Sequence, residues 1–145
     1  MSKNLFYLNY FQKKKLRNVK DNKYNIKLHL NGLFIHEKVM YYRIKIANNS
    51  NVSYDISQLR FFIRDQKKAK RTASQEIEIS PLYIYNNTEL IEGKSLVCLV
   101  FALPKFTIPD KKYLAIQLME DQGGRNLELQ LKNKKLMRLA VLSTL

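Results

Sequence analysis

YDISQLRFFIRDQKKAKRTASQEIEISPLYIY, residues 54–85, decides the fold, because it holds two candidate strands joined by a basic connection. Apolar residues stand at every second position in Leu59–Arg64 and again in Glu76–Tyr85, where Pro81 interrupts the pattern. A period of two is typical of a pleated strand with one buried face. The stretch therefore predicts two neighbouring strands of a sheet.

The same alternation recurs along most of the chain. Ser95–Leu103 is apolar on both faces, which is typical of a central strand covered on each side. Asn31-Gly32 predicts a tight turn, and Lys134–Leu145 fits either a last strand or a short helix. About seven to nine short strands near ten residues apart predict an all-β, immunoglobulin-like antiparallel β-sandwich. The further candidate strands are Tyr24–Leu30, Leu33–Ile35, Val39–Ala47, Lys112–Met119 and the segment 127–132.

The 145 residues suit one domain. We expect a flexible basic N-terminal arm or linker over residues 1–23 and the β-sandwich over residues 24–145. No run of about 18 apolar residues exists, so no transmembrane helix is predicted. In residues 1–19 the lysines follow the apolar part, which is the wrong order for a secretory signal.

The formal net charge of +14 is concentrated in three segments. Residues 1–30 hold eight Lys/Arg against one Asp, residues 60–71 hold six against one Asp, and residues 132–138 hold four without an acid. Such clusters favour anionic partners, although a solvated surface that maintains solubility explains them as well. The candidate partner-binding residues are Lys67, Lys68, Lys70 and Arg71, which would contact a polyanion or an acidic protein face.

Pairs of carboxylates and histidines give little support for catalysis or metal binding. Glu76 and Glu78 share one strand face, and alternation with isoleucines predicts that this face is solvated. His29 and His36 lie on opposite sides of the predicted turn, and two histidines without a third ligand make a weak metal site. We predict no metal site.

Two short motifs also have plainer explanations than a reactive site. Gly93-Lys94-Ser95 resembles the end of a phosphate-binding loop, but a strand candidate follows it where that loop needs a helix. Cys98, the single cysteine, stands within an apolar run and is interpreted as a small core residue. We therefore predict no enzyme and no cofactor.

Three blocks carry a resemblance to a known family: SYDISQLRFFIRD (53–65), KRTASQEIEISPLYIY (70–85) and FALPKFTIPDKKYLAIQLME (101–120). Together with the sequence around them, residues 48–131, they resemble the TraN family of Bacteroides-type conjugative transposons. The resemblance implies the β-sandwich C-terminal domain of a DNA-transfer component in a type IV secretion-like machine. That domain would lie in the periplasm, associated with the outer membrane, among other conjugation-apparatus proteins and in an oligomer within the complex.

The family resemblance supplies no catalytic or ligand residues to assign. Its members are usually longer, with a preceding domain and an export signal. The first hypothesis is therefore a non-enzymatic structural and interaction component of a conjugative transfer complex. The alternative is a basic module that binds the transferred single-stranded DNA directly, through phosphate contacts.

Overall fold

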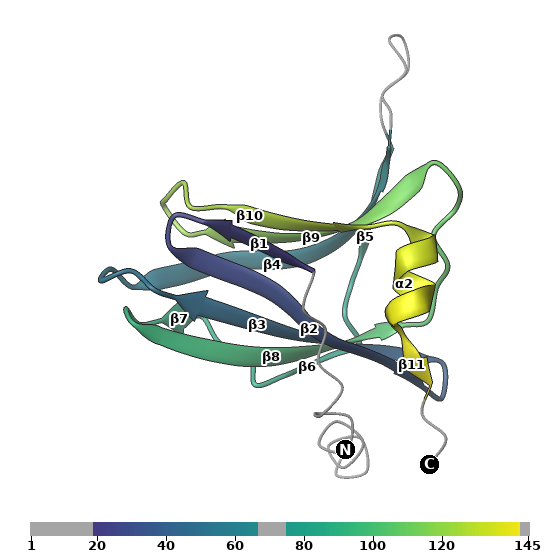
Figure 1. Cartoon of the computed structure of the whole chain (residues 1–145), viewed down its shortest axis with the longest axis horizontal. Coiled ribbons are helices and arrows are strands. Elements are labelled where there is room, and N and C mark those ends of the chain that lie inside the picture. Colours follow the sequence, from purple (N-terminus) through teal and green to yellow (C-terminus); the bar gives the residue numbers. More distant parts are fainter. Residues whose placement is uncertain (1–18, 67–74, 143–145) are drawn as a thin grey trace, which may run out of the picture.

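The computed structural model describes residues 19–66 and 75–142, and it shows two packed β-sheets (Figure 1). The β-sandwich predicted from the alternation is confirmed. Apart from one parallel pair, the strands of both sheets run antiparallel. The strands and the helix are β1 (Lys20–Lys23), β2 (Ile26–His36), β3 (Val39–Asn48), β4 (Tyr54–Asp65), β5 (Glu76–Ile79), β6 (Tyr83–Tyr85), β7 (Leu90–Ile91), β8 (Ser95–Pro104), β9 (Lys112–Glu120), β10 (Leu127–Leu131), α2 (Asn133–Leu139) and β11 (Val141–Leu142).

The first sheet has six strands in the order β1-β2-β3-β8-β6, and β11 adds to β2 in parallel. The second has five, in the order β10-β9-β4-β5, with β7 also paired to β4. The edge formed by β1 and β2 contacts β10, and on the other side of the sandwich β7 contacts β8. That other side is formed by β6 and β8 of the first sheet and by β5 and β7 of the second. We call this second side the lateral edge.

The core fills the space between the sheets with the apolar residues that the period of two predicts. Phe61 of β4 contacts Tyr42 of β3 and Phe101 of β8, with ring centroids 5.2 and 5.3 Å apart. All three side chains are almost fully buried. Edge-to-face and tilted ring pairs of this kind stabilise beyond their buried area. This aromatic contact joins the two sheets near the middle of the sandwich.

The outer face of the five-stranded sheet is held by ion pairs. Arg64 of β4 pairs with Glu76 of β5 and with Glu128 of β10, and its guanidinium lies 4.8 Å from the ring centre of Phe62. Partial burial lowers the pKa of Arg64, but the hydrogen bonds to Glu76 and Glu128 together raise it by more, so the net shift is upward. One arginine thus links three strands and shields the ring of Phe62.

The turn predicted at Asn31-Gly32 is wrong, because β2 continues through it with a β-bulge between Leu30 and Gly32. A Cβ on Gly32 would stand 2.8 Å from Nη2 of Arg43, so a larger residue would force that guanidinium to shift. The same nitrogen donates to the carbonyl oxygen of Asn31 at 3.2 Å. The turn lies six residues later, at Glu37 and Lys38, whose φ angles are 50° and 64°.

The single strand predicted over Glu76–Tyr85 is also wrong in part. It is two strands, β5 and β6, which belong to different sheets. Pro81 lies between them, where the chain crosses from one sheet to the other. The chain leaves the five-stranded sheet here because proline has no backbone N–H to donate to a neighbouring strand.

The ends of the described chain refine two further predictions. Sheet structure already begins at Lys20, four residues before the expected start at Tyr24. The segment Lys134–Leu145, expected as a strand or a helix, contributes both α2 and β11. Within residues 19–66 and 75–142, no helix has the length and apolar character needed to cross a membrane.

Candidate interaction sites

The predicted partner-binding residues Lys67, Lys68, Lys70 and Arg71 lie outside the described residues. The residues that flank them are linked by hydrogen bonds and an ion pair. The backbone N–H of Gln75 donates to Oδ2 of Asp65 at 3.1 Å, and Nζ of Lys112 lies 3.0 Å from Oδ1 of the same carboxylate. Hydrogen bonds to Lys112 and Gln75 lower the pKa of Asp65. The described residues on either side of the basic connection, Asp65 and Gln75, therefore lie next to each other near Lys112.

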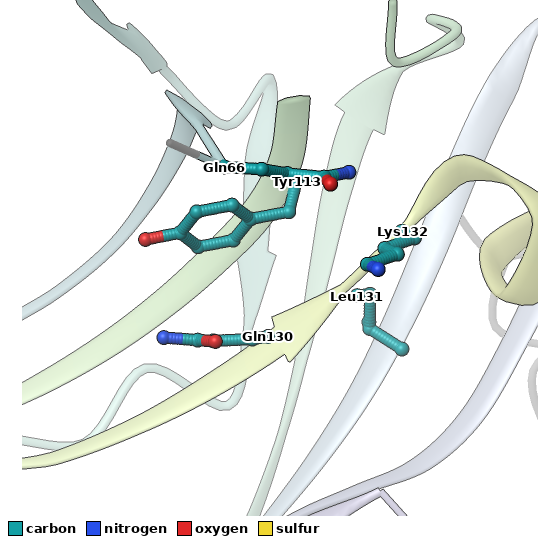
Figure 2. A pocket seen from close by; sticks show the side chains of 5 residues that line it. All are labelled: Gln66, Tyr113, Gln130, Leu131 and Lys132. Carbon is teal, nitrogen blue, oxygen red and sulfur yellow. The ribbon is translucent and has the colours of Figure 1, made fainter. Parts of the chain in front are cut away.

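A pocket of about 420 Å³ lies at the α2 end of the sandwich (Figure 2). Its polar lining consists of two carboxamides, a phenol and an ammonium group, from Gln66, Gln130, Tyr113 and Lys132. Leu131 completes the wall. In Figure 2 the ring of Tyr113 and the carboxamide of Gln130 extend to the same side, and Lys132 marks the start of α2. A pocket rich in hydrogen-bond donors suits an anionic or polar ligand.

Two residues that line the pocket, Gln66 and Lys132, are far apart in the sequence. Gln66 directly precedes the basic connection, and Lys132 is the first residue of the C-terminal basic cluster. Gln66 is fixed there by its backbone N–H, which donates to the carbonyl oxygen of Lys111 at 2.8 Å, and by its side chain, which donates to that of Lys112 at 2.9 Å. Sequence reasoning found both charge clusters, but not that Gln66, next to the first, and Lys132, in the second, line one pocket.

The lateral edge exposes apolar side chains. Seven large apolar residues are exposed in the described part of the chain; four of them belong to strands of this edge and a fifth to the connection between β5 and β6, with exposed fractions between 43% and 61%. Scattered apolar residues on a surface need no explanation, whereas a group on one edge indicates an interaction site. The five residues are Ile77, Leu82, Tyr83, Leu90 and Leu96.

The same edge contains an open stretch of sheet. β7 pairs with β4 at Tyr54 and Asp55, and β5 pairs with it from Phe61 to Arg64. Between these pairings the backbone N–H of Ile56 donates to the carbonyl oxygen of Glu89 at 2.8 Å, and no described strand covers residues 57–60 on this side. An open strand edge of this kind can accept a partner segment.

A cavity of about 190 Å³ opens beside this stretch, between the two sheets. Its walls are mixed: half of the lining residues are apolar, and polar side chains lie along the segments 57–58 and 87–89. It is large enough for an apolar side chain of a partner. The apolar lining residues are Ile56, Leu59, Ile84, Leu99 and Phe101.

The lateral edge differs in charge from the rest of the protein. Residues 75–93 contain four glutamates and no lysine or arginine, although the whole chain carries +14. Glu78 pairs with Arg60 at 3.2 Å, and Glu76 pairs with Arg64. The predicted solvated face of Glu76 and Glu78 is confirmed as a row of partly exposed ion pairs across two strands.

The structure places the other candidates from the sequence on β2, on β8 and in the turn before β8. His29 and His36 are both on β2, and the described residues contain no group of three or more potential metal ligands. Cys98 is half-buried on β8 and lies outside the core, so its interpretation as a core residue is wrong. Burial raises the pKa of its thiol. Lys94 sits in a turn that leads into β8, as expected for Gly93-Lys94-Ser95.

Residues 2–141 match a protein family described as a domain of unknown function, DUF4138. The chain belongs to this family. The DUF4138 match covers both sheets, the pocket and the lateral edge. Comparison with curated proteins gives no match.

Proposed function

We propose that this protein is a non-enzymatic structural and interaction component of a conjugative DNA-transfer complex in the cell envelope, of the type IV secretion kind. The lateral edge carries the proposal, because it combines exposed apolar side chains, an open strand edge and a cavity with both apolar and polar walls. Its four glutamates favour a protein partner over the phosphates of DNA. The resemblance of residues 48–131 to the TraN family supplies the setting: the periplasm, near the outer membrane.

The partners in this proposal are other proteins of the transfer apparatus, and no cofactor takes part. The decisive experiment is a pull-down from cells that carry the full transfer operon, with and without nuclease. Partners that remain after nuclease treatment and at high salt support the interaction component, because apolar contacts are insensitive to both. Loss of every partner under either treatment would contradict it.

Adding negative charge to the lateral edge should weaken its binding to partner proteins. In the variant Leu82→Glu with Leu90→Glu, each new carboxylate would have to leave water for an apolar contact, so we expect at least about a tenfold loss of affinity. Both side chains are exposed in the free protein, so the thermal midpoint should stay within a few degrees of the parent. Quantitative pull-down and a thermal melt measure the two effects.

Tyr24→Glu is the matched control for this pair of substitutions. Tyr24 is also about half exposed, but it lies in the turn between β1 and β2, away from the lateral edge. Capture by this control should equal that of the parent. If the control and the edge variant lose the same amount of partner binding, the lateral edge is not the interaction site. The same holds if the edge variant binds partners as the parent does.

The pocket at the α2 end favours the second candidate, a basic module that binds the transferred single-stranded DNA. Lys132, Lys134 and Lys135 stand together there, and Tyr113 offers a ring on which a base can stack. Replacing all three lysines by glutamate should weaken binding of a single-stranded oligonucleotide. It should also flatten the plot of log affinity against log salt by about 2, since each lost phosphate contact removes about 0.7.

Lys94→Glu, in the turn at the opposite end of β8 from α2, is the control for this measurement. Its salt dependence should match that of the parent. If the triple variant binds the oligonucleotide as the parent does, DNA contact at the α2 end is excluded. If the parent shows no salt-dependent binding at all, the DNA alternative fails and the interaction component stands alone.

A further inference from the structure

β5 is the last strand of the five-stranded sheet and has one open side (Figure 1). Its residues Glu76–Ile79 pair with β4, and no described strand pairs with its other side. In an antiparallel ladder every second residue turns its N–H and C=O groups to the same neighbour, so half of these groups in β5 point away from β4. An extended chain can satisfy such a row in register, which makes this side of β5 a strand acceptor.

The inner face of β5 is incompletely covered. Ile77 lies opposite Ile63 of β4, yet it is 55% exposed, whereas Ile79 packs against the core. A strand added beyond β5 would place a side chain directly beside Ile77, because cross-strand neighbours on one face stand about 5 Å apart. Since Ile77 is apolar, an apolar side chain suits this position of the added strand best.

The outer face of β5 is acidic. Glu76 and Glu78 lie on it, and each pairs with an arginine of β4. Arg64 lies between Glu76 and Glu128 of β10, so the charges alternate in sign across the sheet and end in carboxylates at the open side of β5. A cation on the next strand would continue this alternation, whereas an anion there would be repelled.

We propose that the open side of β5 binds an extended segment of a partner protein in which lysine or arginine alternates with apolar residues. This inference rests on the proposed function, because it names the partner chemistry of the lateral edge. The basic side chains would face Glu76 and Glu78, and the apolar ones would cover Ile77. A second copy of this chain is disfavoured, because two antiparallel copies of β5 would set glutamates opposite glutamates.

Two synthetic peptides of about ten residues test the sign of the charge on the purified full chain. In one, lysine alternates with valine; in the other, glutamate replaces lysine. The net charge of +14 attracts the glutamate peptide non-specifically, so the global charge and the proposal predict opposite preferences. We expect the lysine peptide to bind about threefold to tenfold more tightly by fluorescence anisotropy. Equal affinities, a preference for glutamate, or no binding of either peptide would overturn the proposal.

Backbone methylation of the lysine peptide tests the strand pairing. Methyl groups on the lysine nitrogens block one edge of the peptide, and methyl groups on the valine nitrogens block the other. Only the edge that faces β5 matters, so one methylated peptide should bind at least about tenfold more weakly and the other should bind as the unmodified peptide does. Equal effects of the two modifications would mean that the peptide does not add as a strand.

Hydrogen exchange locates the bound peptide. The unmodified lysine peptide should slow amide exchange in residues 76–79 and leave β1 unchanged. Exchange that is unaffected in β5 would contradict the proposal. Exchange in β5 that slows with protein concentration in the absence of peptide would show that a second copy occupies this side, and it would equally overturn the partner strand.

Replacing Glu76 and Glu78 together by glutamine should abolish the preference for the lysine peptide. Glu89→Gln with Glu92→Gln is the matched control, because it makes the same charge change on the lateral edge outside β5. All four glutamates are exposed, so both double variants should keep the thermal midpoint of the parent within a few degrees. An unchanged preference in the β5 variant, or an equal loss in the control, would rule out recognition by β5.

The outcomes separate this inference from the proposed function. Peptide binding is measured on the purified protein, whereas the proposed function is tested by pull-down from cells that carry the transfer operon. Nuclease-resistant partners without a preference for the lysine peptide would overturn the strand inference and leave the interaction component standing. A preference for the lysine peptide without such partners would contradict the proposed function and leave a strand-binding edge whose partner lies outside the transfer apparatus.

Discussion

Replacing Phe61 by alanine is expected to lower the free energy of unfolding by about 3–5 kcal/mol. Phe61 is the residue through which β4 of one sheet contacts β3 and β8 of the other, and its ring has no exposure to water. The substitution removes both ring contacts and leaves a cavity that Tyr42 and Phe101 can close only by shifting their strands. Urea denaturation followed by circular dichroism measures the loss.

Phe62→Ala is the matched control, because it changes the same residue type one position later on the same strand. Phe62 faces outward under the guanidinium of Arg64, which can move down or admit water when the ring is removed. We therefore expect a smaller loss, roughly 1–2 kcal/mol. Equal losses for the two variants would mean that the contact between the sheets does not dominate the stability of the sandwich.

The alternation that makes Phe61 and Phe62 point in opposite directions is also what made the fold predictable. A strand with one face on the core must change faces at every residue, so Val39–Ala47 and Lys112–Met119 are found within one residue of their predicted ends. Ser95–Leu103 looked covered on both faces, and the structure explains why: Phe101 lies in the main core, while Ala102 lies in a second buried cluster with Phe34, Tyr41 and Tyr85.

The wrong predictions have local physical causes about which an alternating pattern carries no information. Asn31-Gly32 has the composition of a hairpin turn, but a β-bulge also uses glycine, and the deciding contact is the guanidinium of Arg43. β5 and β6 continue one alternating pattern across Pro81, because alternation reports the buried face and not the sheet to which a strand belongs. Strand type was therefore easier to predict than strand partners.

The candidate sites could not be predicted from the sequence for a similar reason. Gln66 and Lys132 line one pocket although they are far apart in the chain, and only the pairing of β4 with β9 and of β9 with β10 brings them together. The lateral edge was likewise invisible in the sequence. Leu82 and Leu90 look like ordinary core residues there, and their exposure depends on which strand edges remain open.

Changing Asn48 to aspartate should destabilise the protein by about 2–5 kcal/mol at neutral pH. Asn48 is fully buried at the end of β3, where its Nδ2 donates to the carbonyl oxygens of Val52 at 2.8 Å and Ile91 at 3.1 Å. Its Oδ1 accepts from the backbone N–H and the hydroxyl of Ser50. One amide thus ties β3 to the following turn and to β7, which none of the apolar patterns could reveal.

An aspartate at this position would direct a carboxylate oxygen at two carbonyl oxygens and would lose both donated hydrogen bonds. Burial and the carbonyl dipoles should raise the pKa of this carboxyl in the folded state, so the folded protein would bind a proton more readily than the unfolded chain. The deficit of the variant should therefore shrink as the pH falls towards about 4, the ordinary pKa of aspartate, and grow as the pH rises. Denaturation midpoints at several pH values, compared with those of the parent, measure this trend.

Asn49→Asp, at an exposed neighbouring position, should show neither the loss nor the trend. A deficit in Asn48→Asp that does not change with pH would mean that the lost hydrogen bonds, and not the buried charge, account for it.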